Sequence, residues 1–341
     1  MDLFTNITAA IIALVVTAML GFIIIPVLRR LKYGQTILDI GPAWHKNTKQ
    51  GTPTMGGVMF IAGTLAAFGT GLWLLWSRGL IDFETDGGVR FFAAVSGILM
   101  AMCFAFVGFL DDFIKVRRKR NEGLTANQKI IFQVMIISAY FTARVMSGNT
   151  STAINIPVIG VQIDLSYFYY VIMGLVILYL VNAVNLTDGI DGLCGSVTLV
   201  YTAAFMVICS LLGFTELSLL SVAAAGGCLG FLVWNFYPAK VFMGDTGSMF
   251  LGGIVCALGI GAGAEVIMLI AAAVYIWEAL TVLIQVIYFK LTKGKRLFKM
   301  TPIHHSFELR GWKEVPIVLL FSLLTAIAGF LAIILTINFT G

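Results

Sequence analysis

Long apolar runs, separated by short polar segments, dominate the pattern of this chain. Ten of them approach or exceed the roughly 20 residues that a helix needs to cross a hydrocarbon core of about 30 Å. The runs cover residues 7–28, 56–76, 91–111, 130–146, 167–184, 195–213, 217–236, 248–263, 265–290 and 316–338. They lack the alternation of apolar and polar residues that marks membrane β-barrel strands. The pattern predicts an all-α integral membrane protein with ten transmembrane helices in a single polytopic domain, residues 1–341.

The composition supports this prediction. Hydrophobic residues make up 59% of the chain and charged residues 11%, whereas a soluble domain has about 25% charged residues. The first run lacks the basic segment and small-residue cleavage site of a signal peptide, so we expect it to be a retained helix. The five Cys are dispersed without CxxC spacing, which argues against a disulfide framework and against a metal cluster.

The basic residues fall almost entirely on one side of the predicted helices. Of the 22 Lys and Arg, all except Arg78, Arg90 and Arg144 lie in connections that follow odd-numbered helices. Because basic connections stay in the cytoplasm, we expect these connections there and both chain termini outside.

Carboxylates and histidines gather on this same basic side. They are Asp111 and Asp112 at the end of the third helix, Asp188 and Asp191 after the fifth, Asp245 at the opening of the eighth, and His304 and His305 before the tenth. A basic face that collects such groups favours the handling of an anionic compound.

The acidic residues favour magnesium chemistry. Mg²⁺ is held by one or two carboxylates together with substrate phosphate oxygens, so a few Asp suffice for a nucleotide diphosphate site. Adjacent helical residues point about 100° apart, and Asp111 and Asp112 therefore have different tasks. Asp188 and Asp191 come together if their turn is helical, but Gly189 and Gly192 favour a loop equally.

Two glycine-rich segments are candidate phosphate contacts. Residues 244–248, Gly-Asp-Thr-Gly-Ser, are typical of a turn that enters a helix, with backbone N–H groups free to receive phosphate. Residues 51–57 are also glycine-rich but lack the Gly-Lys-Ser/Thr ending of a P-loop, so a Walker-type ATPase is unsupported. His304 and His305 have no Cys or HExxH partner, which favours phosphate contact or carboxylate orientation over zinc.

Two further segments are less specific. Glu278, Thr281 and Gln285 form a polar stripe on the ninth helix, which either packs against polar partners or lines a cleft. On the opposite side, residues 153–156 and 158–163 form short stretches in which apolar and polar residues alternate, and Pro157 and Gly160 favour a turn. This pattern predicts a small hairpin without visible chemistry.

Five motifs occur together in the order of one known family. They are Lys49-Gln50-Gly51-Thr52-Pro53-Thr54-Met55-Gly56-Gly57, Asp111-Asp112, Asn185-Leu186-Thr187-Asp188-Gly189-Ile190-Asp191-Gly192, Phe242-Met243-Gly244-Asp245-Thr246-Gly247-Ser248 and Pro302-Ile303-His304-His305. The chain resembles the polyprenyl-phosphate N-acetylhexosamine-1-phosphate transferases from about Gly34 to Trp312. The first motif and the segment from His304 to Trp312 favour the phospho-N-acetylmuramoyl-pentapeptide transferase branch over the N-acetylglucosamine branch.

The resemblance implies a ten-helix fold with a cytoplasmic active-site cleft in the bacterial inner membrane. There, undecaprenyl phosphate attacks UDP-MurNAc-pentapeptide, UMP leaves and lipid I stays in the bilayer. Asp245 is similar to the Mg²⁺ ligand, and Asp111 and Asp112 to an acidic pair assigned to the lipid phosphate or the metal. The positions that match the nucleotide and substrate cleft are Lys49, Thr54, Asn182, Asn185, Asp188, Gly189, Asp191, Asn235, Phe242 and Gln285.

The chain departs from the family in one motif. His304 and His305 match the first two residues of a His-His-His motif whose third position is Ser306 here.

Lys115, Lys119 or Lys129 would reduce the repulsion between two phosphates, alongside Mg²⁺. Base catalysis by Asp111 or Asp112 is a further hypothesis, although a lipid phosphate is already largely ionised near pH 7.

Two alternatives remain open. An N-acetylglucosamine-1-phosphate transferase of the same family shares the chemistry and differs in its sugar nucleotide. A secondary transporter fits the composition, although transporters place ionisable groups near the bilayer midplane in repeated halves. No nucleic-acid partner is expected, and the sequence leaves the oligomeric state open, with a homodimer as one candidate.

Overall fold

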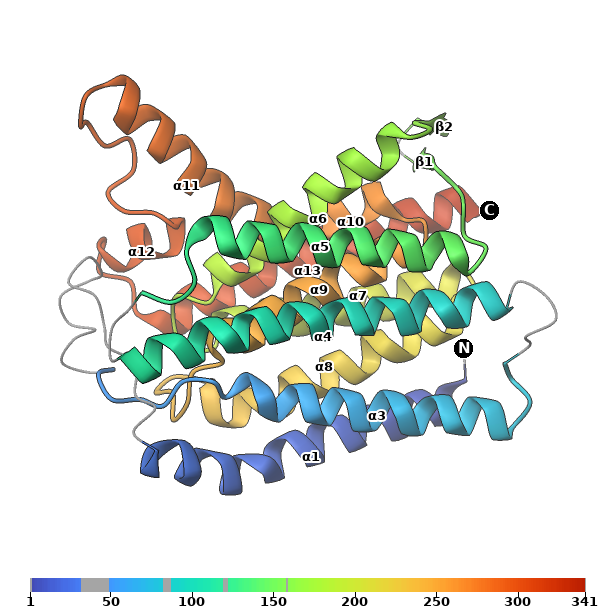
Figure 1. Cartoon of the computed structure of the whole chain (residues 1–341), viewed down its shortest axis with the longest axis horizontal. Coiled ribbons are helices and arrows are strands. Elements are labelled where there is room, and N and C mark those ends of the chain that lie inside the picture. Colours follow the sequence, from blue (N-terminus) through green and yellow to red (C-terminus); the bar gives the residue numbers. More distant parts are fainter. Residues whose placement is uncertain (1, 32–48, 82–86, 119–121, 158, 341) are drawn as a thin grey trace.

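The computed structural model describes residues 2–31, 49–81, 87–118, 122–157 and 159–340. Its helices are α1 (Leu3–Arg30), α3 (Gly57–Ser77), α4 (Gly87–Arg118), α5 (Ala126–Met146), α6 (Phe168–Thr187), α7 (Leu193–Leu211), α8 (Thr215–Asn235), α9 (Gly244–Gly261), α10 (Glu265–Ala271), α11 (Ala273–Leu291), α12 (Ile303–Glu308) and α13 (Glu314–Thr340). Within these described ranges, ten helices are long and apolar enough to cross a membrane, which confirms the predicted all-α membrane fold. Most of them run along the long axis of one bundle (Figure 1).

Helix α9 is the centre of the bundle and contacts α3, α4, α6, α7 and α8. Small residues permit these close contacts. A Cβ atom on Gly253 would lie 2.6 Å from the Cα of Ala101 on α4, and one on Gly252 would lie 2.7 Å from the Cα of Val181 on α6. Because membrane helices associate through close packing more than through the hydrophobic effect, these glycines determine how α4 and α6 lie against α9.

Helix α4 is longer than the sequence pattern predicts. It continues to Arg118, so Asp111 and Asp112 lie inside the helix and not at its end. Lys115, Arg117 and Arg118 occupy its last turn, where cations interact favourably with the helix dipole. Lys115 Nζ also lies 2.6 Å from Asp111 Oδ2 one turn earlier. The two aspartates, expected at the end of this helix, therefore lie within it, and the basic residues of its last turn stabilise the extension to Arg118.

The predicted ninth helix is interrupted. Helix α10 ends at Ala271 and α11 begins at Ala273. Helix α11 projects away from the bundle, and α12 follows it at the same end of the molecule (Figure 1). Because the segment contains neither Gly nor Pro, its apolar pattern gave no sign of the break.

The predicted hairpin is present at the opposite end of the molecule from α12 (Figure 1). Strands β1 (Ala153–Ile156) and β2 (Val161–Asp164) pair antiparallel, with Ala153 opposite Asp164. The second strand begins at Val161 rather than Val158, because the chain reverses through Gly160, whose φ is +64°.

Candidate functional site

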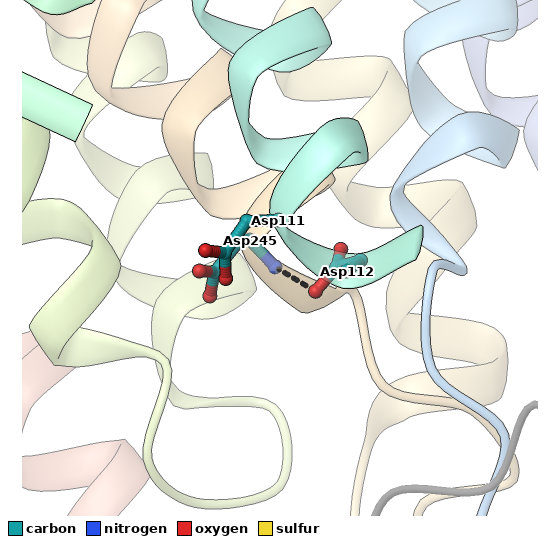
Figure 2. A group of neighbouring side chains, drawn as sticks. All are labelled: Asp111, Asp112 and Asp245. Atoms are coloured by element: carbon teal, nitrogen blue, oxygen red, sulfur yellow. Dashed lines mark hydrogen bonds between the residues drawn. The ribbon is translucent and has the colours of Figure 1, made fainter. Parts of the chain in front are cut away.

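Three carboxylates from two helices meet at one end of the bundle. Among the described residues, Asp111 and Asp112 of α4 and Asp245 of α9 each place an oxygen within 4.8 Å of the others, an arrangement that can hold a metal ion. Figure 2 shows the side chains of Asp111 and Asp245 next to each other, while Asp112 points toward the backbone nitrogen of Asp245. The predicted gathering of acidic groups is confirmed for these three residues.

A glycine allows the two helices to bring these carboxylates together. Gly108 lies one turn before Asp111 and Asp112, and a Cβ atom on it would lie 2.2 Å from the carbonyl oxygen of Asp245. A larger side chain at position 108 would therefore push the first turn of α9 away from α4.

Asp112 caps helix α9 from the neighbouring helix. Its carboxylate accepts hydrogen bonds from the backbone N–H of Thr246 at 2.9 Å, from the Thr246 hydroxyl at 2.7 Å and from the backbone N–H of Asp245 at 3.2 Å. The first N–H groups of a helix lack partners within the helix, and an anion there interacts favourably with the helix dipole. The expectation that these N–H groups are free to receive phosphate is therefore wrong for Asp245 and Thr246.

Two lysines neutralise the other carboxylates. Lys129 Nζ lies 2.8 Å from Asp245 Oδ2 and 3.1 Å from Asp111 Oδ1. Lys115 Nζ lies 3.2 Å from Asp245 Oδ2, in addition to its contact with Asp111. Lys119, the third predicted lysine, lies outside the described residues. Asp111 and Asp245 thus share two ammonium groups, whereas Asp112 is engaged by α9, so the two adjacent aspartates have different partners.

The last turn of α6 supports Asp245. Asn185 was expected in a connection, but α6 continues to Thr187. Asn185 Nδ2 donates to Asp245 Oδ1 at 3.1 Å and to Ser248 Oγ at 2.8 Å. Asn182, on the same face one turn earlier, donates to Gln133 Oε1 on α5 at 3.0 Å.

A second charged cluster surrounds Lys49. Its ammonium lies 2.7 Å from Asp191 Oδ1 and 2.6 Å from Glu314 Oε2, and all three side chains are buried. Glu314 Oε2 also accepts the backbone N–H of Asp191 at 2.8 Å, and Asp191 Oδ2 accepts that of Ala239 at 2.8 Å. The sequence pattern did not identify Glu314, because it lies beyond the motifs, at the start of α13.

Asp188 and Asp191 lie in a loop and not on one helical turn. Helix α6 ends at Thr187, and Gly192 has a φ of +77° before α7 begins. Burial, followed by the negative charges of Asp245 and Asp112, raises the pKa of Asp188 to about 8. Asp188 is thus electrostatically coupled to the three-carboxylate group, whereas Asp191 belongs to the Lys49 cluster.

The glycine-rich entry to α3 is docked on the entry to α9. Phe242 donates its backbone N–H to Pro53 O and accepts that of Gly56, both at 2.8 Å. This pairing brings Thr54 beside the start of α9, where a Cβ on Gly244 would lie 2.9 Å from Thr54 Oγ1. Asn235 holds two nearby loops, because it accepts the N–H of Gly192 at 3.1 Å and donates to Val241 O at 2.9 Å.

The two histidines have different carboxylate partners. His304 is fully buried, with Nδ1 3.1 Å from Glu278 Oε2. A Cβ on Gly189 would lie 2.1 Å from His304 Nε2, so the glycine lets this loop approach the imidazole. His305 Nδ1 lies 2.6 Å from Glu308 Oε2.

The polar stripe of the ninth helix faces protein groups. Glu278 and Thr281 are fully buried, and Gln285 Oε1 accepts the backbone N–H groups of Leu297 at 3.1 Å and Phe298 at 2.8 Å. Ser306, at the third position of the histidine motif, binds the backbone of Met300 through both its N–H and its carbonyl. Gln285 of α11 and Ser306 of α12 therefore fasten the second half of the connection between these helices, residues 297–300.

Family models match two parts of this site. The model described as glycosyl transferase family 4 matches residues 94–263. The model described as phospho-N-acetylmuramoyl-pentapeptide-transferase signature 1 matches residues 49–61, the docked entry to α3.

Curated relatives match nearly the whole chain. A phospho-N-acetylmuramoyl-pentapeptide-transferase of Clostridioides difficile is 44% identical over 95% of this chain and 96% of its own length. Proteins of the same name from Halalkalibacterium halodurans and Acetivibrio thermocellus are 42% and 44% identical, covering 97% and 92% of this chain and 97% and 91% of their own lengths. The chain therefore belongs to the phospho-N-acetylmuramoyl-pentapeptide-transferase family.

Proposed function

We propose that this protein transfers phospho-MurNAc-pentapeptide from UDP-MurNAc-pentapeptide to undecaprenyl phosphate, which forms lipid I for peptidoglycan synthesis. An oxygen of the lipid phosphate forms a bond to the sugar-linked phosphorus, and UMP leaves with the electrons of the bond that breaks. The observation that carries the proposal is the convergence of three carboxylates and two lysines in a chain of this family. Such a site can bind a diphosphate and an acceptor phosphate together.

The three-carboxylate group fits Mg²⁺ as the cofactor. Its donors are hard carboxylate oxygens within 4.8 Å of one another, which is the ligand chemistry that Mg²⁺ prefers. We assign the metal to Asp245 with the help of Asp111, because Asp112 is engaged in capping α9. Mg²⁺ bound there would neutralise phosphate charge and polarise the phosphoryl group.

Lys115 and Lys129 then act on the substrates. Both ammonium groups lie within 3.2 Å of Asp245, and they are the cations placed to offset the charge of two approaching phosphates. Removing one such stabilising group typically lowers the rate by about 10²–10³-fold.

Positioning and electrostatics account for this chemistry better than base catalysis. The lipid phosphate is largely ionised at pH 7, since its second pKa is about 6. The hydrogen bonds that Asp112 accepts from α9 also argue against its serving as the base. If Asp111→Asn and Asp112→Asn each keep turnover while Asp245→Asn loses it, neither residue is a base.

The nucleotide and sugar are assigned to the surrounding residues. These are Lys49, Thr54, Asn182, Asn185, Asp188, Gly189, Asp191, Asn235, Phe242 and Gln285, with His304 and His305 beside them. The Lys49 cluster and the Gly189–His304 approach join the α6–α7 loop to α12 and α13, which supports one continuous binding region for the donor.

The distribution of basic residues supports an assignment of the candidate site to one side of the membrane. The site lies at the end of the molecule that carries the α11–α12 connection (Figure 1), and the basic connections are on this side of the predicted helices. We therefore propose that it faces the cytoplasm from the bacterial inner membrane, with both termini outside. A homodimer stays a prediction, which size determination in a membrane mimetic tests.

The deciding experiment uses radiolabelled UDP-MurNAc-pentapeptide and undecaprenyl phosphate, with and without Mg²⁺. A lipid-extractable product and equimolar UMP, both dependent on Mg²⁺, are the expected results. A lipid-linked product from radiolabelled UDP-N-acetylglucosamine but not from UDP-MurNAc-pentapeptide would identify the other branch of the family. Ion flux in proteoliposomes without UMP release would identify a transporter and overturn the proposal.

A further inference from the structure

The last turn of α11 and its connection to α12 carry a concentrated positive charge. Residues 290–299, here called the basic loop, contain five cations and no acidic residue: Lys290, Lys293, Lys295, Arg296 and Lys299. All five are exposed. Within the described part of the chain, none of them forms a salt bridge, in contrast to the lysines of the three-carboxylate group.

Apolar side chains stand among these cations. Leu291 is 78% exposed, Leu297 52% and Phe289 46%. Exposed leucines beside unpaired cations are unfavourable in water, but they suit the boundary between acyl chains and headgroups, where apolar groups insert and cations remain at the phosphate level.

The position of the basic loop points to the same boundary. It begins in the last turn of α11, which is a candidate membrane span with only 33% of its most apolar stretch buried inside the protein. Because α11 projects away from the bundle (Figure 1), the loop at its end is separated from most of the protein surface. A membrane-spanning helix that leaves the bundle is surrounded by lipid, so lipid headgroups are the partners nearest its end.

The basic loop is also fastened to both neighbouring helices. Gln285 of α11 accepts two of its backbone N–H groups, and Ser306 of α12 binds Met300, the residue that follows the loop. Helix α12 is joined to α11 a second time through His304 and Glu278. Hydrogen bonds thus connect the loop, α11 and α12 to one another. A shift of the loop would therefore change the position of α12 and of His304.

We propose that the basic loop binds the phosphate headgroups of anionic phospholipids and thereby holds α11 and α12 in the arrangement described above. Each Lys or Arg near an anionic membrane surface strengthens binding by about fivefold. Headgroup binding is electrostatic and therefore weakens as salt rises. The lipid contact does not depend on the proposed function, but its effect on turnover rests on it.

The test compares three proteins in nanodiscs of phosphatidylcholine with increasing phosphatidylglycerol. They are the unaltered chain, the variant K293Q/K295Q/R296Q/K299Q, and the control R29Q/R30Q, which removes two exposed cations from the end of α1. Native mass spectrometry measures retained phosphatidylglycerol, and lipid I synthesis is measured at saturating undecaprenyl phosphate. We expect the unaltered chain and the control to retain several-fold more phosphatidylglycerol than the loop variant and to gain turnover with it.

Equal retention by all three proteins overturns the proposal, as does a turnover gain that the loop variant shares. Recovery of turnover in phosphatidylcholine discs on adding glycerol 3-phosphate would identify a soluble phosphate site and also overturn it. If the fourfold variant unfolds, K295Q/R296Q is measured in the same way. Absence of lipid I in every disc would instead contradict the proposed function, and the retention measurement would still decide the lipid site.

Discussion

Lys49 Nζ lies 2.6 Å from Glu314 Oε2 although 265 residues separate them in the chain. The same Glu314 oxygen accepts the backbone N–H of Asp191. One carboxylate at the start of α13 therefore orients both a buried cation and the loop that follows α6. Removing one partner of a buried charged pair leaves the other uncompensated, which is strongly destabilising.

Glu314→Gln should raise the KM for UDP-MurNAc-pentapeptide about tenfold and leave the KM for undecaprenyl phosphate unchanged. The amide oxygen can still accept the N–H of Asp191, but it no longer holds the Lys49 ammonium by charge. Steady-state kinetics with each substrate varied in turn checks this, with the exposed Glu122→Gln as the control. A parallel rise in both KM values would contradict a role limited to the nucleotide side.

Gly108→Ala should lower the thermal midpoint and reduce turnover about tenfold. Its Cβ would meet the carbonyl oxygen of Asp245 at 2.2 Å, and overpacking of this kind costs about 1–3 kcal/mol. Gly69→Ala on α3 is the matched control, because a Cβ there meets nothing within 4 Å and alanine favours a helix. Thermal unfolding and turnover are measured on both, and equal effects would rule out the α4–α9 contact as the cause.

Mg²⁺ should stabilise Lys129→Gln more than it stabilises the unaltered chain. Without metal, Lys129 pairs with Asp245 and Asp111, and its loss leaves Lys115 alone to offset the repulsion between these two carboxylates. A ligand that binds only the folded state raises stability by RT ln(1 + [L]/Kd), and a more negative site lowers Kd. Thermal midpoints in EDTA and in Mg²⁺ give the shift, with the exposed Lys240→Gln as the control; identical shifts would argue against a metal at this site.

Asp188→Asn should flatten the dependence of stability on pH in EDTA. The folded pKa of about 8 lies above the ordinary value of 3.8, so the folded chain keeps a proton that the unfolded chain releases. The resulting stabilisation is complete below about pH 4 and is lost as pH rises to about 8. Thermal midpoints across this window test the sign, and an unchanged slope in the variant would exclude Asp188 as its source.

Asp164→Asn tests a carboxylate whose contribution to stability changes with pH in the opposite direction. The Thr152 hydroxyl and the Ser166 N–H hold the pKa of exposed Asp164 below its usual value. Its contribution to stability is therefore present above the ordinary pKa and lost only in acid. We expect this variant to keep the slope of the unaltered chain between about pH 5 and about pH 8.

Much of the fold was predictable because a bilayer demands long apolar helices. The same demand explains why Asp111, Asp112 and Asp245 could be expected together, since carboxylates in such a chain collect at the watery ends of helices. Their pairing with Lys115 and Lys129 was harder to predict from the sequence, because these lysines were expected to contact substrate phosphates and not the carboxylates.

Other features depend on contacts that no local pattern encodes. Glu314 lies outside every motif, and Ser248 and Gln133 became visible only as the partners of Asn185 and Asn182. The interruption between α10 and α11 has no Gly or Pro to mark it. The loss of free N–H groups at the start of α9 could not be foreseen, because their acceptor, Asp112, comes from a different helix.

The capping of α9 by Asp112 has an evolutionary consequence. One carboxylate secures the fold of the helix that presents Asp245 and also lies beside the two carboxylates to which we assign the metal, so a substitution at residue 112 disturbs both the helix and the site. A compound that competes for this position would leave the bacterium little freedom to escape by mutating residue 112, and resistance would have to arise at more distant positions.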